Sequence, residues 1–191
     1  MLRHQLRCYT AQTMLDELPY RLALIAVAAV QGVVSRGYMK RAKAGATVFQ
    51  QRAEGLPLAV AIGTCYAAYC LAVLVYMIHP PWMAWSAVPL PASLRWAGGM
   101  VMAAGAALHL WGMHHLGANL TISISTRDGH TLVTTGPYRW VRHPLYAGGM
   151  LESVGVCLLL ANGAVVVSAF AFWLLIAWRT PAEEVRLPPL I

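Results

Sequence analysis

Five long apolar stretches constrain the fold of this chain more than any other feature. They cover residues Leu18–Val34, Leu58–Ile78, Leu94–Leu116, Leu145–Ala161 and Gly163–Trp178. A helix needs about 20 apolar residues, within a range of about 17–25, to cross the hydrocarbon core of a bilayer. The last stretch is short but carries no charged residue. We therefore expect an all-α integral membrane protein with about five transmembrane helices in a single membrane domain, residues 1–191.

The composition argues against a soluble protein. Hydrophobic residues make up 59% of the 191, charged residues only 11%, and the mean hydropathy is +0.57. Soluble domains carry about 25% charged residues, so a soluble globule of this composition would lack polar surface. The net charge of +7 lies between the apolar stretches, where loops face anionic lipid, and not in a basic stripe. This placement indicates a membrane partner and no nucleic acid.

The basic residues between the stretches predict the orientation. Segments 35–57, 117–144 and 179–191 carry Lys or Arg, whereas segment 79–93 carries none. Basic loops remain on the cytoplasmic side of a membrane. Five spans with the N-terminus outside would place all three basic segments in the cytoplasm. Asn162-Gly163 is a turn signal, so we expect the last two spans to form a tight helical hairpin.

Several polar residues interrupt the apolar stretches. In the first stretch Arg21 and Gln31 lie near the ends, where long side chains can reach the interface. His109, His114 and His115 in the third stretch do not have the i, i+4 spacing of metal ligands on a helix. We expect polar packing or substrate contact for them and no metal site. The four cysteines form no CxxC pair, which indicates neither a zinc site nor a disulfide framework.

Small residues and one carboxylate also stand out inside the spans. Residues 97–112 read AGGMVMAAGAALHLWG, and small residues at three- and four-residue spacing are typical of close helix packing in lipid. Glu152 is a carboxylate inside the fourth stretch, which is costly unless the group is paired or functional. It follows His143 by nine residues. It is therefore a candidate substrate contact, or alternatively a neutral side chain hydrogen-bonded to another helix.

The sequence GPYRWVRHPLYAGG, residues 136–149, precedes the fourth apolar run. Pro144 lacks a backbone N–H and suits the first turn of a helix. His143 should therefore stand at a helix start, where free N–H groups and the helix dipole favour an anion. We expect a preformed corner that carries Tyr138, Arg139, Arg142, His143 and Tyr146. The alternative is an interfacial belt of aromatic and basic side chains that anchors the helix.

A second charged segment, RTPAEE, covers residues 179–184 and follows the fifth stretch. The hairpin would return it to the same face as the corner. Arg179, Glu183 and Glu184 together with that corner suit a zwitterionic ligand, although juxtamembrane charges also mark the ends of spans.

The run HTLVTTGPYRWVRHPLYAG, a hairpin of two spans and then RTPAEE together resemble the isoprenylcysteine carboxyl methyltransferase family, which is related to membrane phospholipid methyltransferases. The resemblance covers about Leu116 to Leu187. It implies an all-helical membrane enzyme that binds S-adenosylmethionine in a pocket open to the cytosol. Segments 117–144 and 179–191 would form that pocket, and a lipid-like substrate would enter it sideways from the bilayer.

The resemblance also implies a set of functional residues. Those facing the cofactor would be Ser123, His130, Thr131, Leu132, Val133, Tyr138, His143, Pro144, Leu145, Tyr146 and Glu183. Arg179 would face the methyl acceptor. Family members usually continue after the paired glutamates into an amphipathic helix, whereas Pro188 and Pro189 follow here. We therefore expect either weaker cofactor binding or a more open cofactor site.

The chemistry of methyl transfer suits these residue types. A carboxylate is already a nucleophile, so the protein needs only to align it with the methyl group and exclude water. Arg179 can orient a carboxylate through a bidentate pair. An amine or thiol acceptor would require a base, for which His143 and Glu184 are the candidates.

Four functions follow from these patterns, and we favour the first. It is S-adenosylmethionine-dependent methylation of a lipophilic acceptor, with a carboxylate as the favoured group. The others are N- or S-methylation of a phospholipid or small molecule, an NADPH-dependent activity like that of sterol reductases, and a non-enzymatic role as a membrane subunit.

Overall fold

The computed structural model describes residues 12–44, 56–117 and 133–184, and its regular elements are all helical. The five long helices are α2 (Leu18–Ala44), α3 (Leu56–Ile78), α4 (Ala92–Leu116), α5 (Pro144–Leu160) and α6 (Gly163–Glu184). Two short 3-10 helices, η1 (Pro80–Ser86) and η3 (Gly136–Arg139), lie in the connections. The predicted all-α class is confirmed, and each long helix contains most or all of one predicted apolar stretch.

Within the described residues, three helical segments are long and apolar enough to cross a membrane: Leu18–Lys40, Pro57–Ile78 and Gly163–Pro181. Helix α5 is apolar but shorter, and α4 carries three histidines and an arginine. The count of five spans therefore stays a prediction.

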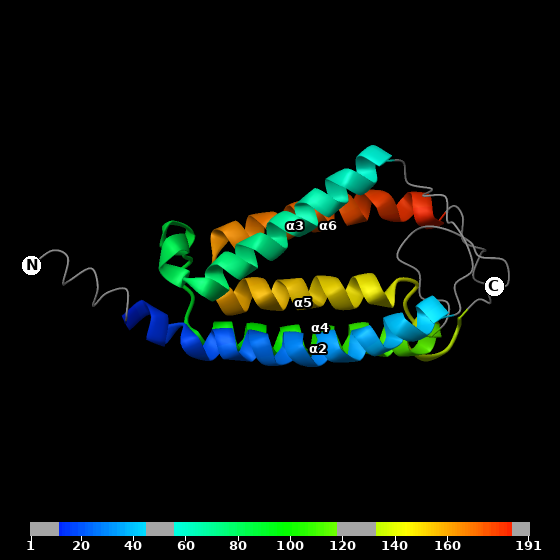
Figure 1. The fold of residues 1–191 in the computed structure, drawn as a ribbon, viewed down its shortest axis with the longest axis horizontal. Helices are drawn as coiled ribbons and strands as arrows, with labels where there is room; N and C mark the ends of the chain where they lie inside the picture. Colours follow the sequence, from blue (N-terminus) through cyan, green and yellow to red (C-terminus); the bar gives the residue numbers. More distant parts are fainter. Residues whose placement is uncertain (1–11, 45–55, 118–132, 185–191) are drawn as a thin grey trace, which may run out of the picture.

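The helices form two layers joined at one end (Figure 1). Helices α4 and α5 pack closely, and α2 lies mainly against α4. Helices α3 and α6 pack against each other on the other side of α5. The turn after α5 is short, with Ala161 in the left-handed region at φ 50°. Helix α6 then packs mainly against α3, so close pairing of α5 and α6 along their length is not confirmed.

Glycines at seven-residue intervals bring α4 and α5 into backbone contact. Gly98 and Gly105 on α4 face Gly155 and Gly148 on α5. A Cβ atom on Gly155 would lie 2.5 Å from the Cα of Met102 and 2.7 Å from the Gly98 carbonyl oxygen. Seven residues are nearly two helical turns, so these positions share one face of each helix. We call this contact the glycine seam, and it confirms close packing for the third apolar stretch.

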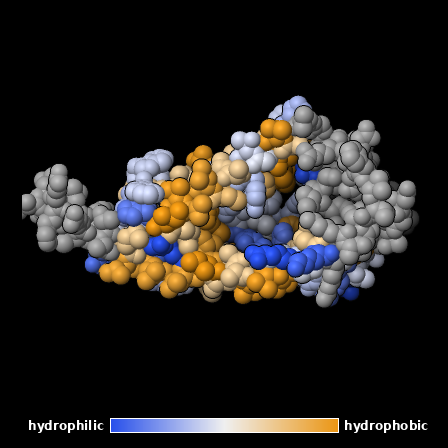
Figure 2. Space-filling view, viewed as in Figure 1, coloured by the Kyte–Doolittle hydropathy of each residue, from blue (hydrophilic) through white to orange (hydrophobic). Residues whose placement is uncertain are grey.

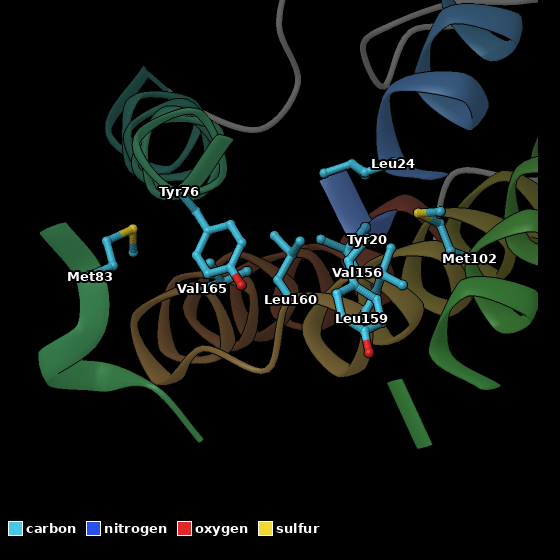
Figure 3. Packing of buried hydrophobic residues seen from close by; sticks show 9 residues of the cluster. All are labelled: Tyr20, Leu24, Tyr76, Met83, Met102, Val156, Leu159, Leu160 and Val165. Carbon is cyan, nitrogen blue, oxygen red and sulfur yellow. The ribbon is translucent and has the colours of Figure 1, made fainter. Parts of the chain in front are cut away.

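The buried apolar core lies at the end of the bundle where α3 ends and α4 begins. Figure 3 shows its nine members, Tyr20, Leu24, Tyr76, Met83, Met102, Val156, Leu159, Leu160 and Val165. At the opposite end a smaller cluster surrounds Met113. The buried apolar side chains are therefore concentrated at one end of the bundle.

A polar cluster closes the core end. The Arg95 guanidinium makes two hydrogen bonds to the Glu17 carboxylate, at 2.9 and 2.5 Å, and lies 3.6 Å from the ring centroid of Tyr20. The Tyr76 hydroxyl donates to the same carboxylate at 2.5 Å. Sequence reasoning overlooked Arg95, a basic residue at the predicted outer end. Its pairing with Glu17 neutralises that charge.

The α5–α6 turn is fixed by the side chain of Asn162, which is 1% exposed. Its amide donates to the carbonyl of Met83 at 3.0 Å, and its oxygen accepts from the hydroxyl of Ser86 at 3.0 Å. The same oxygen accepts from the backbone N–H of Ala164 at 3.1 Å, which caps the start of α6. One side chain thus joins the turn to η1.

Candidate functional site

The predicted corner is present at the end of the bundle opposite the core. Pro137 and Pro144 are fully buried; Pro137 is the second residue of η3, and Pro144 is the first of α5. Gly136 has φ +61° and faces the ring of His115 so closely that a Cβ atom would collide with it. Only glycine combines this φ with this lack of space at low cost. The contact with His115 therefore holds the start of η3 against the end of α4.

His143 lies immediately before α5, as the following proline predicts. Its ring stacks on Tyr146 with centroids 5.4 Å apart and an interplanar angle of 8°. The pair presents two aromatic rings beside the first backbone N–H groups of α5. Such a helix start favours a negatively charged group.

Tyr138 and its neighbours give the corner two different faces. Tyr138 is partly buried, and burial raises the pKa of its hydroxyl from 10.0 to about 12, so it is neutral at physiological pH. Trp140 is 65% exposed, and the Arg139 guanidinium lies 4.7 Å from its ring centroid. The exposed side chains therefore have the composition of an interfacial belt, whereas Tyr138 and His143 are partly buried.

The structure places some of the remaining predicted site residues, whereas others lie outside its described part. Arg179 is buried and belongs to the C-terminal part of α6. That end of α6 lies at the same end of the bundle as the start of α5 (Figure 1). Leu145 packs against Met113 of α4, and Val133 lies in the described stretch before η3. The residues outside the described part of the chain are Ser123, His130, Thr131 and Leu132. Glu183 and Glu184 belong to α6, but their side chains also lie outside that part.

Glu152 takes the second of its two predicted roles, a hydrogen bond to another helix. The amide of Gln31 on α2 donates to its carboxyl oxygen at 2.9 Å. Gln31 therefore contacts another helix and does not extend along its own helix to the interface as expected. Arg21 donates to the carbonyl of Met77 at the end of α3, and its reach to the interface stays a prediction. A role for Glu152 in substrate contact stays a prediction.

The three histidines of α4 make packing contacts in the structure. The Tyr38 hydroxyl and His114 Nδ1 are 3.2 Å apart, and His115 Nδ1 lies 3.2 Å from the carbonyl oxygen of Trp111. His109 lies deeper in α4, next to α5. These contacts agree with the expected polar packing.

Sequence reasoning missed the role of Trp173. A Cβ atom on Gly149 would lie 3.2 Å from the Trp173 ring and 3.8 Å from His109 Nδ1, so α4, α5 and α6 meet there. A tryptophan in an apolar stretch resembles a lipid-facing residue, so this contact could not be predicted from the sequence. Figure 2 shows a hollow between the α3–α6 layer and the α5–α2 layer, with hydrophilic residues along it and hydrophobic surface around it.

Comparison with known proteins finds a match to just under half of the chain, the part that contains this corner. The model of the isoprenylcysteine carboxyl methyltransferase (ICMT) family matches residues 98–189, which confirms the resemblance for this region. It begins within α4 and includes η3, α5 and α6. The apolar helices and this match together make the chain an integral membrane protein.

Curated relatives match this chain over stretches similar in length to the family match. A protein-S-isoprenylcysteine O-methyltransferase from Rattus norvegicus is 36% identical over 94 residues, 48% of this chain and 33% of the relative. One from Dictyostelium discoideum is 32% identical over 108 residues, 54% of this chain and 46% of the relative. Protein-S-isoprenylcysteine O-methyltransferase A from Arabidopsis thaliana is 45% identical over 67 residues, 33% and 32% of the two chains. The matched region spans less than half the length of each of these relatives.

Proposed function

We propose that this chain, whose residues 98–189 match the isoprenylcysteine carboxyl methyltransferase family, is an integral membrane methyltransferase. It transfers a methyl group from S-adenosylmethionine to a lipophilic acceptor, with a carboxylate as the favoured group. The observation that carries the proposal is the coincidence of the matched region with α4, η3, α5 and α6. These elements form the rigid corner and bear the buried Arg179.

The corner fits S-adenosylmethionine. This cofactor supplies a methyl group on a positively charged sulfur, beside an amino acid carboxylate and an adenosine. The stacked rings of His143 and Tyr146 offer a flat surface for the base or for the sulfonium. The start of α5 suits the carboxylate. Tyr138 is neutral, so it can donate a hydrogen bond without adding a charge. We assign Glu183 and residues 130–133 to the same cofactor site.

Arg179 is the proposed orienting group for the acceptor. Its guanidinium is held in a buried side chain, where a carboxylate partner is bound more strongly than in water. It aligns the carboxylate oxygen with the methyl group and needs no base, because the oxygen is already ionised. For an amine or thiol acceptor, His143 or Glu184 would accept the proton.

We place the corner on the cytoplasmic side, with the N-terminus outside. The three basic segments support this orientation. At the other end of the bundle the exposed Trp82 and Trp85 of η1 resemble an interfacial aromatic belt. The Arg95–Glu17 ion pair neutralises the positive charge of Arg95, a basic residue at the proposed outer end. Residues 1–191 then form one membrane domain.

Binding and transfer can be tested separately on the full chain purified in detergent. We expect calorimetry to detect S-adenosylmethionine and its demethylated product but not NADPH. The Arg179→Met variant should lose at least about 100-fold in methyl transfer, in the range for loss of one electrostatic contact to reacting groups. Its cofactor affinity should stay within about threefold. The control is Arg139→Met, which removes an exposed guanidinium from the same end of the bundle.

Each contrary result points to a different function. Binding of NADPH in place of the sulfur compounds would favour the reductase alternative. Absence of binding by all three, in protein that unfolds cooperatively, would favour a non-enzymatic subunit. Transfer by Arg179→Met at the wild-type rate would refute the role of Arg179 and leave the cofactor site standing.

A further inference from the structure

A continuous line of aromatic rings runs across the exposed side of the corner. It extends from α2 over the end of α4 to the residue that follows η3, and its members are, in order, Tyr38, His114, His115, Trp111 and Trp140. Centroids of neighbouring rings are 5.2 to 5.9 Å apart. Trp111 and Trp140 are 41% and 65% exposed. We call this surface the ring line.

Contacts with the bundle hold the ring line in place. The Tyr38 hydroxyl of α2 lies 3.2 Å from His114 Nδ1 of α4. The ring of His115 lies against Gly136, the first residue of η3. The rings therefore come from three segments that are already joined to one another. A surface formed in advance loses little conformational entropy when it binds a ligand.

One end of the ring line carries hydrogen-bond donors only. The Arg139 guanidinium lies 4.7 Å from the ring centroid of Trp140, and that ring lies 5.9 Å from the ring of Trp111. A guanidinium has five N–H groups and an indole has one, and neither group accepts a hydrogen bond. None of these three side chains makes a hydrogen bond or an ion pair with a described residue. The donors are therefore available to an acceptor from outside the chain.

The arginines at the two ends of the bundle differ in their partners. At the core end Arg95 pairs with Glu17, and Arg21 donates to a backbone carbonyl. At the corner end Arg139 and Arg142 are exposed, and neither forms an ion pair with a carboxylate in the described ranges. Positive charge without a compensating carboxylate attracts an anion. The corner end therefore suits an anionic ligand, whereas the core end does not.

The ring line lies where α2 leaves the membrane core. The apolar segment of α2 is Leu18–Lys40, and Tyr38 is two residues from its end. The ends of α2 and α4 lie together in Figure 1. Tryptophan and tyrosine side chains prefer the depth of the lipid head groups. At that depth a phosphate group offers acceptor oxygens and a negative charge, which match the donors of Arg139, Trp140 and Trp111.

We propose that the ring line binds the head group of an anionic phospholipid. The phosphate oxygens accept hydrogen bonds from the Arg139 guanidinium, which suits a bidentate pair, and from the indole N–H groups of Trp140 and Trp111. A zwitterionic head group brings an ammonium group towards the same positive surface, so it binds less tightly. The site is separate from the proposed cofactor pocket and does not depend on the reaction that the chain catalyses.

The test compares phosphatidylglycerol with phosphatidylcholine of identical acyl chains, on the full chain purified in detergent. Native mass spectrometry gives the affinity of each lipid. We expect phosphatidylglycerol to bind about 5-fold more tightly, the ratio for one cation near a negatively charged lipid surface. Glycerol phosphate has the same phosphate chemistry but no acyl chains. At equal concentration it should not displace the lipid, and neither should a soluble acidic peptide.

Arg139→Gln should abolish the preference for phosphatidylglycerol. The matched control is Arg36→Gln, which removes an exposed guanidinium from α2. Arg36 lies two residues before Tyr38 and so points about 200° around the helix from it. This variant has the same net charge as Arg139→Gln and should keep the preference.

Four results would overturn the inference. They are equal binding of the two lipids, absence of binding by both, a preference that survives in Arg139→Gln, and an equal loss in Arg36→Gln. Displacement of the lipid by glycerol phosphate or by the acidic peptide would overturn the assignment to a lipid. Thermal unfolding of both variants at the wild-type Tm excludes a general loss of structure as the cause.

Discussion

Substitution of Gly155 by alanine should destabilise the protein through the glycine seam. The added Cβ atom would lie 2.5 Å from the Cα of Met102 and 2.7 Å from the Gly98 carbonyl oxygen. Ordinary van der Waals contact for such an atom begins at 3.4 Å, so α4 and α5 must separate locally by about 1 Å. The atoms in the way belong to the backbone, so no rotamer change can relieve the contact.

The expected size follows from two opposing effects. Overpacking a tight interface costs about 1–3 kcal/mol, and a collision with backbone belongs at the upper end of that range. Alanine regains about 1 kcal/mol over glycine within a helix. The net loss is about 2 kcal/mol. For a chain of this size that corresponds to a fall in Tm of about 4–8 °C.

Gly63 of α3 provides the matched control, because a Cβ atom there would meet nothing within 4 Å. Gly63→Ala should leave the Tm unchanged or raise it slightly. Thermal unfolding of both variants in the same detergent, followed by tryptophan emission, makes the comparison. A Gly155→Ala variant as stable as Gly63→Ala would refute backbone contact between α4 and α5.

Three further predictions concern the ends of the bundle. Glu17→Gln should lower the free energy of unfolding by about 2–4 kcal/mol, because it leaves the Arg95 guanidinium without its anion. In a double-mutant cycle, Glu17→Gln/Arg95→Met should recover part of this loss. Asn162→Leu should cost about 2 kcal/mol through loss of the α6 cap and of the bond to Met83, measured by thermal unfolding with Ser168→Ala as the neutral comparison. The raised pKa of Tyr138 means that its contribution to stability is complete below pH 10 and is lost as the pH rises towards 12. Tyr138→Phe should remove that part of the alkaline loss in unfolding curves recorded across this range, and an unchanged pH dependence would contradict the burial of its hydroxyl.

Hydropathy predicted the positions of the helices well but not all of their lengths. The third stretch, Leu94–Leu116, nearly coincides with α4. Helix α2 continues to Ala44, although its apolar stretch ends at Val34. Hydropathy reports where a helix can contact lipid, and a helix continues beyond that limit wherever its backbone hydrogen bonds remain satisfied.

The corner could be predicted from the local sequence, whereas contacts between residues far apart in the sequence could not. Pro144 lacks an N–H, so it marks the start of α5 in any fold. The partners of Glu152 and Arg95 are separated from them by 121 and 78 residues. Such pairs depend on which helices become neighbours, and packing of α6 against α3 follows from the shapes of whole helix surfaces. No single motif encodes it.

The glycine seam also determines where movement is possible. Because α4 and α5 meet backbone to backbone, neither can slide or tilt against the other without a collision. Helices α3 and α6 meet through larger side chains, such as Tyr66 and Phe172 with ring centroids 5.3 Å apart, which can exchange rotamers. A conformational change that admits a bulky lipid should therefore displace α3 and α6. His143, which directly precedes α5, would keep its position, whereas Arg179 on α6 would move.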